Sequence, residues 1–190
     1  MKIAILAYGS LIWDEENLAP RITGGWRRGH GPVLPVEFCR VSPKRGRALV
    51  LALDEEAGAP VPTSHTTSRR HRVEEAVADL AARERCAPRY IGIAHHDGRH
   101  AQCSARIARV VNAWLALTDY DAAIWAGLPA NFEEHAGTPF SHEAGLAWLR
   151  QLPPASLQEG WRYITNAPGE TDTPFRRFLA RQAWWRALTF

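Results

Sequence analysis

The sequence has few of the residues and runs that mark specialised classes of protein. Its three cysteines, Cys39, Cys86 and Cys103, are odd in number and widely spaced, which indicates neither a disulfide framework nor a C-x-x-C site. No apolar run approaches the roughly 20 residues of a membrane span, and the stretch from Met1 to Leu6 is too short for the core of a signal peptide. We therefore expect reduced, mostly buried thiols in a cytoplasmic protein with no membrane segment.

Lysine is also scarce, although the chain is basic. Only Lys2 and Lys44 are lysines among the 23 basic residues, so the other 21 are arginines, and the net charge is +3. The densest basic clusters, at Trp26–Arg28 and Ser68–Arg72, are short, and the second is typical of a solvated loop that enters a helix. Because a nucleic-acid surface needs positive charge gathered on one face, we expect no nucleic-acid partner.

Repeats and low-complexity tracts are absent, and the 13 prolines and 14 glycines are spread along the chain. With 46% hydrophobic residues, eight tryptophans and six phenylalanines, the 190 residues can bury a full core. The sequence predicts one globular domain over residues 1–190.

The hydrophobic pattern predicts both strands and helices. Short β-type runs predict strands at Lys2–Ala7, Val36–Val41, Ala48–Leu53, Tyr90–Ala94 and Ala122–Ala126. Apolar residues at helical spacing, with capping residues, predict helices at Val73–Arg85, Ser104–Leu117, Ser141–Leu152 and from Thr173 to about Trp185. This order indicates an α+β fold with an antiparallel or mixed sheet and a helical C-terminal extension from about residue 141.

The sharpest local feature follows the first predicted strand. Tyr8-Gly9-Ser10-Leu11 places a glycine where the chain must turn tightly, so that successive backbone N–H groups from Gly9 to Leu11 can converge on an anion. An ordinary turn between two segments is the alternative. No G-x-S-x-G elbow surrounds Ser10, so a hydrolytic triad is a poor interpretation.

Two motifs resemble those of a known enzyme family. Tyr8–Trp13 reads Y-G-S-L-I-W, and Leu80–Glu84 fits the pattern L-x-x-R-E. Both are similar to motifs of the ChaC-type γ-glutamylcyclotransferases, within the γ-glutamylcyclotransferase-like superfamily, over about residues 3–90. The resemblance implies a small mixed β-barrel or sheet with flanking helices, and a cavity between the Tyr8–Leu11 loop and Glu84.

The same resemblance implies an activity, which is the release of 5-oxoproline from a γ-glutamyl amide or peptide. Glu84 would be the catalytic acid and base, Tyr8, Gly9, Ser10 and Leu11 would bind the substrate, and no cofactor or metal would be needed. The partner is then a small γ-glutamyl molecule, and a homodimer is left open. Two alternatives remain: Glu84 as a surface residue paired with a neighbouring arginine, and a non-catalytic binding or regulatory protein on the same fold.

A second cluster of chemically active side chains lies between residues 95 and 103. His96, His100 and Cys103 have spacings that zinc ligands can adopt. However, Asp97-Gly98 after a β-type run is typical of a hairpin turn, which would separate these side chains, so we expect a polar loop and no metal site. The segment Asn131–His135 is expected to form a loop that lines a pocket or presents an acidic patch.

Overall fold

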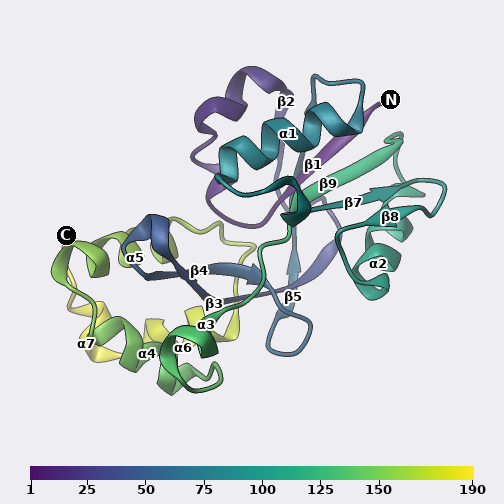
Figure 1. The fold of residues 1–190 in the computed structure, drawn as a ribbon. Helices are drawn as coiled ribbons and strands as arrows, with labels where there is room; N and C mark the ends of the chain where they lie inside the picture. The colour runs from purple at the N-terminus through teal and green to yellow at the C-terminus, as the bar shows by residue number, and fades with distance from the viewer. The chain divides into compact units, whose positions relative to one another are not determined.

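Strand β1 (Ile3–Ala7) has all five residues buried, as a strand in the middle of a sheet requires. The computed structural model describes residues 1–190 and places β1 in a six-stranded sheet of order β2-β6-β1-β9-β7-β8 (Figure 1). The other strands are β2 (Ile22–Arg27), β6 (Ser64–Ser68), β7 (Ile91–His95), β8 (His100–Ala101) and β9 (Ala122–Ala126). Only β1 and β9 pair in parallel, so the predicted mixed sheet is confirmed.

The sheet is open, because β2 and β8 are its two edges and each has one partner strand. The α+β class is therefore confirmed, whereas the closed barrel that the sequence allowed is not present. The chain divides into two compact units. Unit 1 comprises Met1–Leu34 and Pro62–Leu128, and unit 2 comprises Pro35–Val61 and Pro129–Phe190.

Two helices pack on the six-stranded sheet of unit 1. α1 (Val73–Glu84) carries its apolar residues at helical spacing, with Glu74 and Glu75 in the first turn, where negative charge suits the helix dipole. Its apolar residues share one core with Ile3, Ile5 and Ala7 of β1. α2 (Ala105–Leu115) begins one residue after Ser104, the predicted first residue of this helix, and Ser104 caps it because its Oγ accepts a hydrogen bond from Ile107 N at 3.1 Å.

The two helices cover opposite faces of this sheet. Side chains alternate between faces along a strand, so α1 covers the face of Ile3, Ile5 and Ala7. His65 of β6 lies opposite Leu6 in the β1–β6 ladder and therefore on the other face. There its ring contacts Trp114 of α2, with ring centroids 5.1 Å apart.

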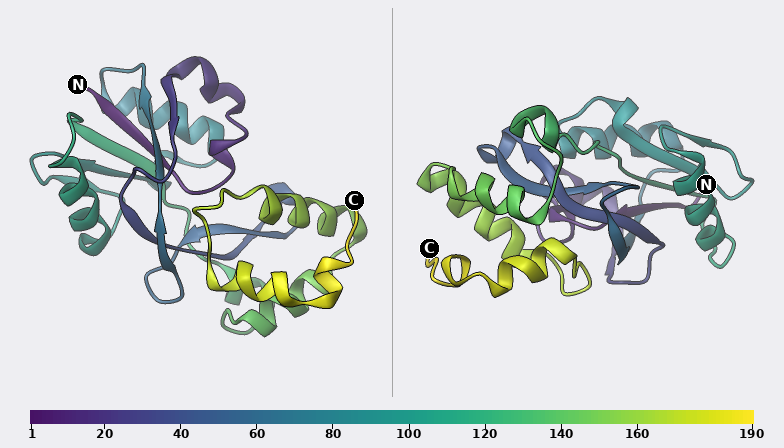
Figure 2. Two further views of the ribbon diagram at one scale, coloured as in Figure 1. Left: turned by 180° about the vertical axis from the view of Figure 1, so that it is seen from behind. Right: turned by 90° about the horizontal axis from the view of Figure 1, so that it is seen from below.

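Unit 2 contains most of a smaller sheet and the remaining helices (Figure 2). The sheet has the order β4-β3-β5, with β3 (Val33–Ser42), β4 (Ala48–Leu53) and β5 (Ala59–Pro62). The strands predicted at Val36–Val41 and Ala48–Leu53 lie within β3 and β4, which pair antiparallel. The helices are α3 (Phe132–Ala136), α4 (His142–Arg150), α5 (Pro154–Asn166), α6 (Pro174–Arg181) and α7 (Ala183–Arg186).

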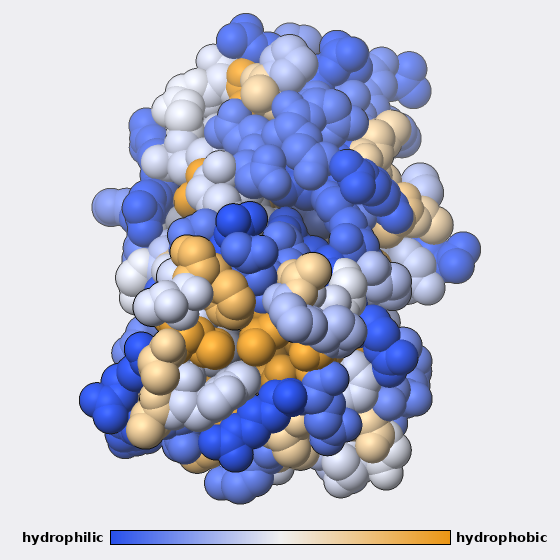
Figure 3. All heavy atoms as spheres, turned by 90° about the vertical axis from the view of Figure 1, so that its left-hand side faces the viewer, coloured by the Kyte–Doolittle hydropathy of each residue, from blue (hydrophilic) through white to orange (hydrophobic).

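Four large hydrophobic residues are exposed, and they are Met1, Val33, Leu117 and Phe190. The surface in the space-filling view is mainly hydrophilic, with hydrophobic side chains gathered in one area of the face drawn (Figure 3). None of the helices is long and apolar enough to cross a membrane. None of the three cysteines forms a disulfide, but only Cys39 is buried, so the prediction of mostly buried thiols was wrong for the half-buried Cys86 and Cys103.

Candidate functional site

The turn after β1 has the shape that the sequence suggested. Gly9 leads into a single 3₁₀ turn, η1 (Ser10–Ile12), closed by a hydrogen bond from Ile12 N to the Gly9 carbonyl at 3.1 Å. The N–H groups of Trp13 and Asp14 both donate to the Ser10 carbonyl, at 3.1 and 2.8 Å. The N–H groups of Ser10 and Leu11 begin the turn and so have no acceptor within it. This end of the turn therefore offers two backbone donors.

The two larger side chains of the motif are held by the protein itself. Tyr8 is buried, and its hydroxyl donates to the carbonyl of Ala126 at 2.6 Å, which links the ends of β1 and β9. Leu11 is also buried and belongs to the core that α1 shares with β1. Both side chains fix the backbone of the turn, and Leu11 offers a ligand its main chain only.

Glu84 is the last residue of α1, next to an unusual buried arginine. Arg83 is 1% exposed, and its Nε and Nη2 donate to the carbonyl of Asp14 at 3.1 and 2.5 Å. The Glu84 side chain is 18% exposed, with its Oε1 3.6 Å from Arg83 Nη1. Arg85 then adopts a left-handed conformation, with φ of 54°, and ends the helix.

These contacts bring the two motif segments together within unit 1. Besides the Arg83–Asp14 hydrogen bonds, Arg85 forms an ion pair with Glu16 at 3.2 Å. Leu11 packs in the same core as Leu80 of α1. The stretch that follows the Tyr8–Leu11 turn is therefore fixed against the C-terminal end of α1, where Glu84 lies.

The positioning role of Arg83 was missed in the sequence, although a signal was present. Arg83 follows Leu80 by three residues and Ala76 by seven, which places it on the apolar face of α1. A charged residue on such a face is rarely left without partners, because burial of an unpaired charge is costly. The spacing alone therefore indicated a buried arginine with specific acceptors.

The other predicted site segments have structural roles here. Asp97-Gly98 forms the expected hairpin turn between β7 and β8, closed by a hydrogen bond from Gly98 N to the His95 carbonyl at 2.9 Å. The structure brings together no group of three His, Cys, Asp or Glu residues that could hold a metal ion. Asn131 accepts from Val41 N at 2.8 Å and donates to the Val41 carbonyl at 3.2 Å, so it anchors its segment to β3. Residues 132–136 form α3 and were expected to be a loop.

Comparisons of the chain with protein-family models, with curated proteins and with solved structures found no match.

Proposed function

We propose that this protein releases 5-oxoproline from a γ-glutamyl amide or peptide, as a γ-glutamylcyclotransferase-like enzyme. One observation carries the proposal: the Tyr8–Leu11 turn, which has two unused backbone donors, and Glu84 belong to segments that Arg83 holds together. The substrate would be a small γ-glutamyl molecule, and the reaction needs no metal or redox cofactor.

The chemistry requires little of the protein. The α-amine of the γ-glutamyl group attacks its own γ-carbonyl, so a C–N bond forms in a five-membered lactam and the original amide C–N bond breaks. Because nucleophile and electrophile belong to one molecule, the protein need only hold a reactive conformation and move protons. One proton must leave the α-ammonium group before attack, and one must reach the departing amine.

Each of these tasks has a candidate residue. The Glu84 carboxylate would accept the proton from the α-ammonium group and later deliver it to the leaving amine, as one general acid–base group can do in sequence. The N–H groups of Ser10 and Leu11 would hold the substrate carboxylate or the developing oxyanion, and such donors contribute about 3 kcal/mol each in comparable sites. Tyr8, whose hydroxyl donates to the Ala126 carbonyl, would pack beside the bound group.

The test is 5-oxoproline release from a panel of glutathione, γ-glutamyl amino acids and γ-glutamyl amines. Wild type is compared with Glu84→Gln and with Glu75→Gln, a control on an exposed residue in the first turn of α1. We expect Glu84→Gln to lower kcat by at least about 100-fold, the usual contribution of a general acid–base group, and Glu75→Gln to leave it unchanged.

Two results would contradict the proposal. Equal rates for Glu84→Gln and wild type would remove Glu84 from the chemistry. Absence of 5-oxoproline from every member of the panel would reject the activity for these substrates. Calorimetric binding of a γ-glutamyl compound without turnover would then support the alternative, a binding or regulatory protein.

A further inference from the structure

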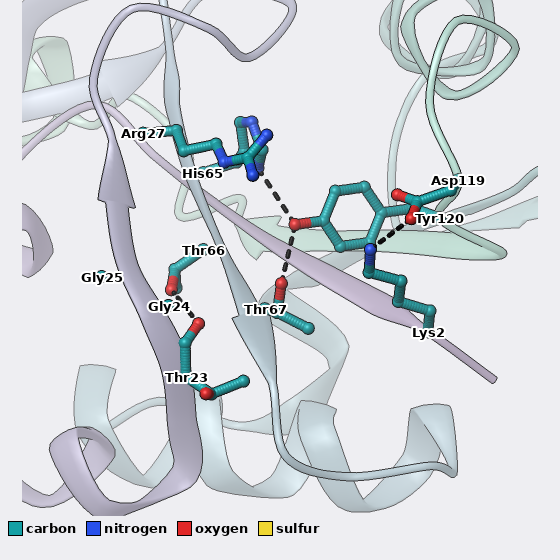
Figure 4. A pocket seen from close by; sticks show the side chains of 10 residues that line it. All are labelled: Lys2, Thr23, Gly24, Gly25, Arg27, His65, Thr66, Thr67, Asp119 and Tyr120. Carbon is teal, nitrogen blue, oxygen red and sulfur yellow. Dashed lines mark hydrogen bonds and ion pairs between the residues drawn. The ribbon is translucent and has the colours of Figure 1, made fainter.

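A polar cavity lies in unit 1, beside the edge strand β2 and its neighbour β6 (Figure 4). Its volume is about 170 Å³, and its walls come from β2, β6 and the residues that precede β1 and β9. A cavity of about 150 Å³ can hold a molecule the size of benzene, so this one suits a small ligand. None of its lining residues belongs to the Tyr8–Leu11 turn or to α1.

The backbone of β2 opens this cavity through a bulge. Thr23 pairs with Thr67 and Arg27 pairs with His65, so three residues of β2 lie opposite one residue of β6. Two of the three are Gly24 and Gly25, with φ of 86° and 66°, and no atom lies within 4 Å of where a Cβ would stand on either. A ligand can therefore approach the β2 main chain closely.

The charged groups around the cavity favour an anion. Arg27 lines it, and its guanidinium, which carries five N–H donors, makes no hydrogen bond or ion pair in the structure. Lys2 Nζ pairs with Asp119 Oδ2 at 2.5 Å, but these side chains are 44% and 76% exposed. An ion pair as exposed as this one contributes little to stability. Lys2 can therefore turn toward a ligand at a small cost in free energy.

A buried polar relay forms another wall. The Tyr120 hydroxyl lies 2.8 Å from Thr67 Oγ1 and 3.3 Å from His65 Nδ1 (Figure 4). Burial lowers the pKa of His65, and the charges of Arg27, His30 and Lys2 lower it further. Both effects favour the neutral imidazole, and the second shows that the positive charges of Arg27 and Lys2 reach this wall of the cavity. The same charges attract an anion.

We propose that this cavity binds a tetrahedral oxyanion, either free phosphate or the phosphate end of a small molecule. A phosphate carries up to two negative charges and at least three strong acceptor oxygens, which matches donors that come from several directions. Arg27 is the principal ligand, Lys2 the second cation, and the Gly24-Gly25 main chain lets the anion approach β2. Asp119 opposes binding through its negative charge.

The site is tested by titrating the ¹⁵N-labelled full chain with sodium phosphate at constant ionic strength, with the amide signals of Gly24 and Gly25 as the readout. Sodium chloride is the reference titration, and acetate tests whether a planar carboxylate serves as well. Methyl phosphate distinguishes free phosphate from the phosphate end of a small molecule. Binding of methyl phosphate would show that the cavity also accepts a phosphate ester, and binding of phosphate alone would indicate the free ion. We expect saturable shifts with phosphate and none beyond ionic strength with chloride.

Three exposed residues supply the variants, so none should disturb folding. Arg27→Gln should weaken phosphate binding about tenfold or more, the loss expected for one charge-assisted contact. Asp119→Asn should strengthen phosphate binding, because it removes the negative charge of the one acidic residue that lines the cavity. The control, Arg109→Gln on α2, removes the same charge outside the cavity and should leave the affinity unchanged.

The opposite signs of the Arg27 and Asp119 effects separate a specific site from general attraction by a basic protein. Three results would each overturn the proposal. Arg27→Gln and Arg109→Gln could lose the same phosphate affinity, or the shifts of the Gly24 and Gly25 amide signals could fail to saturate. The third is acetate binding as tight as phosphate binding. The NMR titration measures binding and needs no catalysis. Phosphate binding can therefore be established even if the protein releases no 5-oxoproline, and 5-oxoproline release can be established even if phosphate does not bind.

Discussion

Glu37 in unit 2 shows how one buried carboxyl group connects segments far apart in the sequence. It is almost fully buried on β3, and its Oε1 accepts hydrogen bonds from Phe38 N at 2.8 Å and from the Thr173 hydroxyl. Its Oε2 accepts from Phe175 N, in the first turn of α6, at 3.1 Å. Glu37 therefore satisfies donors at the start of α6 and fixes that helix against β3.

The protonation of Glu37 makes the stability of the protein depend on pH. Burial raises the pKa of this carboxyl above its ordinary value of 4.5, although the hydrogen bonds from Thr173, Phe38 and Phe175 lower it in part. The folded chain thus keeps a proton that the unfolded chain releases. The stabilisation this provides is full below about pH 4.5 and is lost as the pH rises through the raised value.

We predict that Glu37→Gln removes this part of the pH dependence. The amide does not titrate, and it costs about 1–3 kcal/mol at low pH because its NH₂ group replaces one acceptor oxygen. Urea unfolding between pH 4.5 and 8 should show that the difference in unfolding free energy between wild type and variant shrinks as the pH rises. Glu143→Gln, at an exposed position of α4, is the control. A constant difference at every pH would mean that Glu37 is already ionised throughout.

The elements with a strong local pattern were predicted well from the sequence. The periodicity of α1 and the starts of α4 and α6 depend on residues close together in the sequence, and Ser141 and Thr173 cap these two helices as expected. The Tyr8–Leu11 turn was foreseen for the same reason, since a glycine at the end of a buried strand is a local signal.

Elements whose conformation depends on distant partners were missed or misplaced. β6 reads Ser-His-Thr-Thr-Ser and has no hydrophobic alternation, but it pairs with both β1 and β2. α5 was not predicted, although Pro154 suits the first helical turn that it occupies. The single helix expected from Thr173 to Trp185 is interrupted at Gln182, whose ψ is 122°. The cavity beside β2 escaped prediction because its walls, from Lys2 to Tyr120, meet only in the folded sheet.

Packing between β7 and β9 depends on the absence of one side chain. Gly92 lies directly opposite Trp125 in the ladder, and a Cβ on Gly92 would stand 2.6 Å from Trp125 Cζ2. Trp125 is fully buried, so its ring can shift only by displacing the side chains packed around it. The glycine is therefore required by the tryptophan that covers it.

We predict that Gly92→Ala destabilises the protein by about 1–3 kcal/mol, the usual cost of overpacking. Gly127→Ala is the matched control, since its nearest contact would be the Tyr90 carbonyl at 3.4 Å, an ordinary distance. Urea midpoints compare both variants with wild type. If Gly92→Ala and Gly127→Ala unfolded at the same concentration, the close approach of the Trp125 ring would not limit this position.

The chain passes between its two units three times, so neither unit is one continuous stretch of sequence. Within unit 2, strands β3 and β4 are followed only much later by the helices that pack on them. Phe38 contacts Tyr163 of α5, with ring centroids 6.3 Å apart, and Gly160 of α5 lies against Ala48 of β4. The two strands therefore depend on the last third of the chain.

We predict that a shortened chain of residues 1–128 does not form a stable native state, although it keeps every strand of the six-stranded sheet. It would leave the apolar residues of β3 and β4 without α4, α5 and α6. Phe38, for example, would lose its contact with Tyr163 of α5, and each large side chain exposed in this way costs about 1.5–3 kcal/mol of the 5–15 kcal/mol of a typical domain. Near-ultraviolet circular dichroism and dye binding should show lost tertiary packing and exposed apolar surface. A chain of residues 1–186, which keeps every helix, should stay native, and a cooperative unfolding transition in the 1–128 chain would show that the six-stranded sheet folds without unit 2.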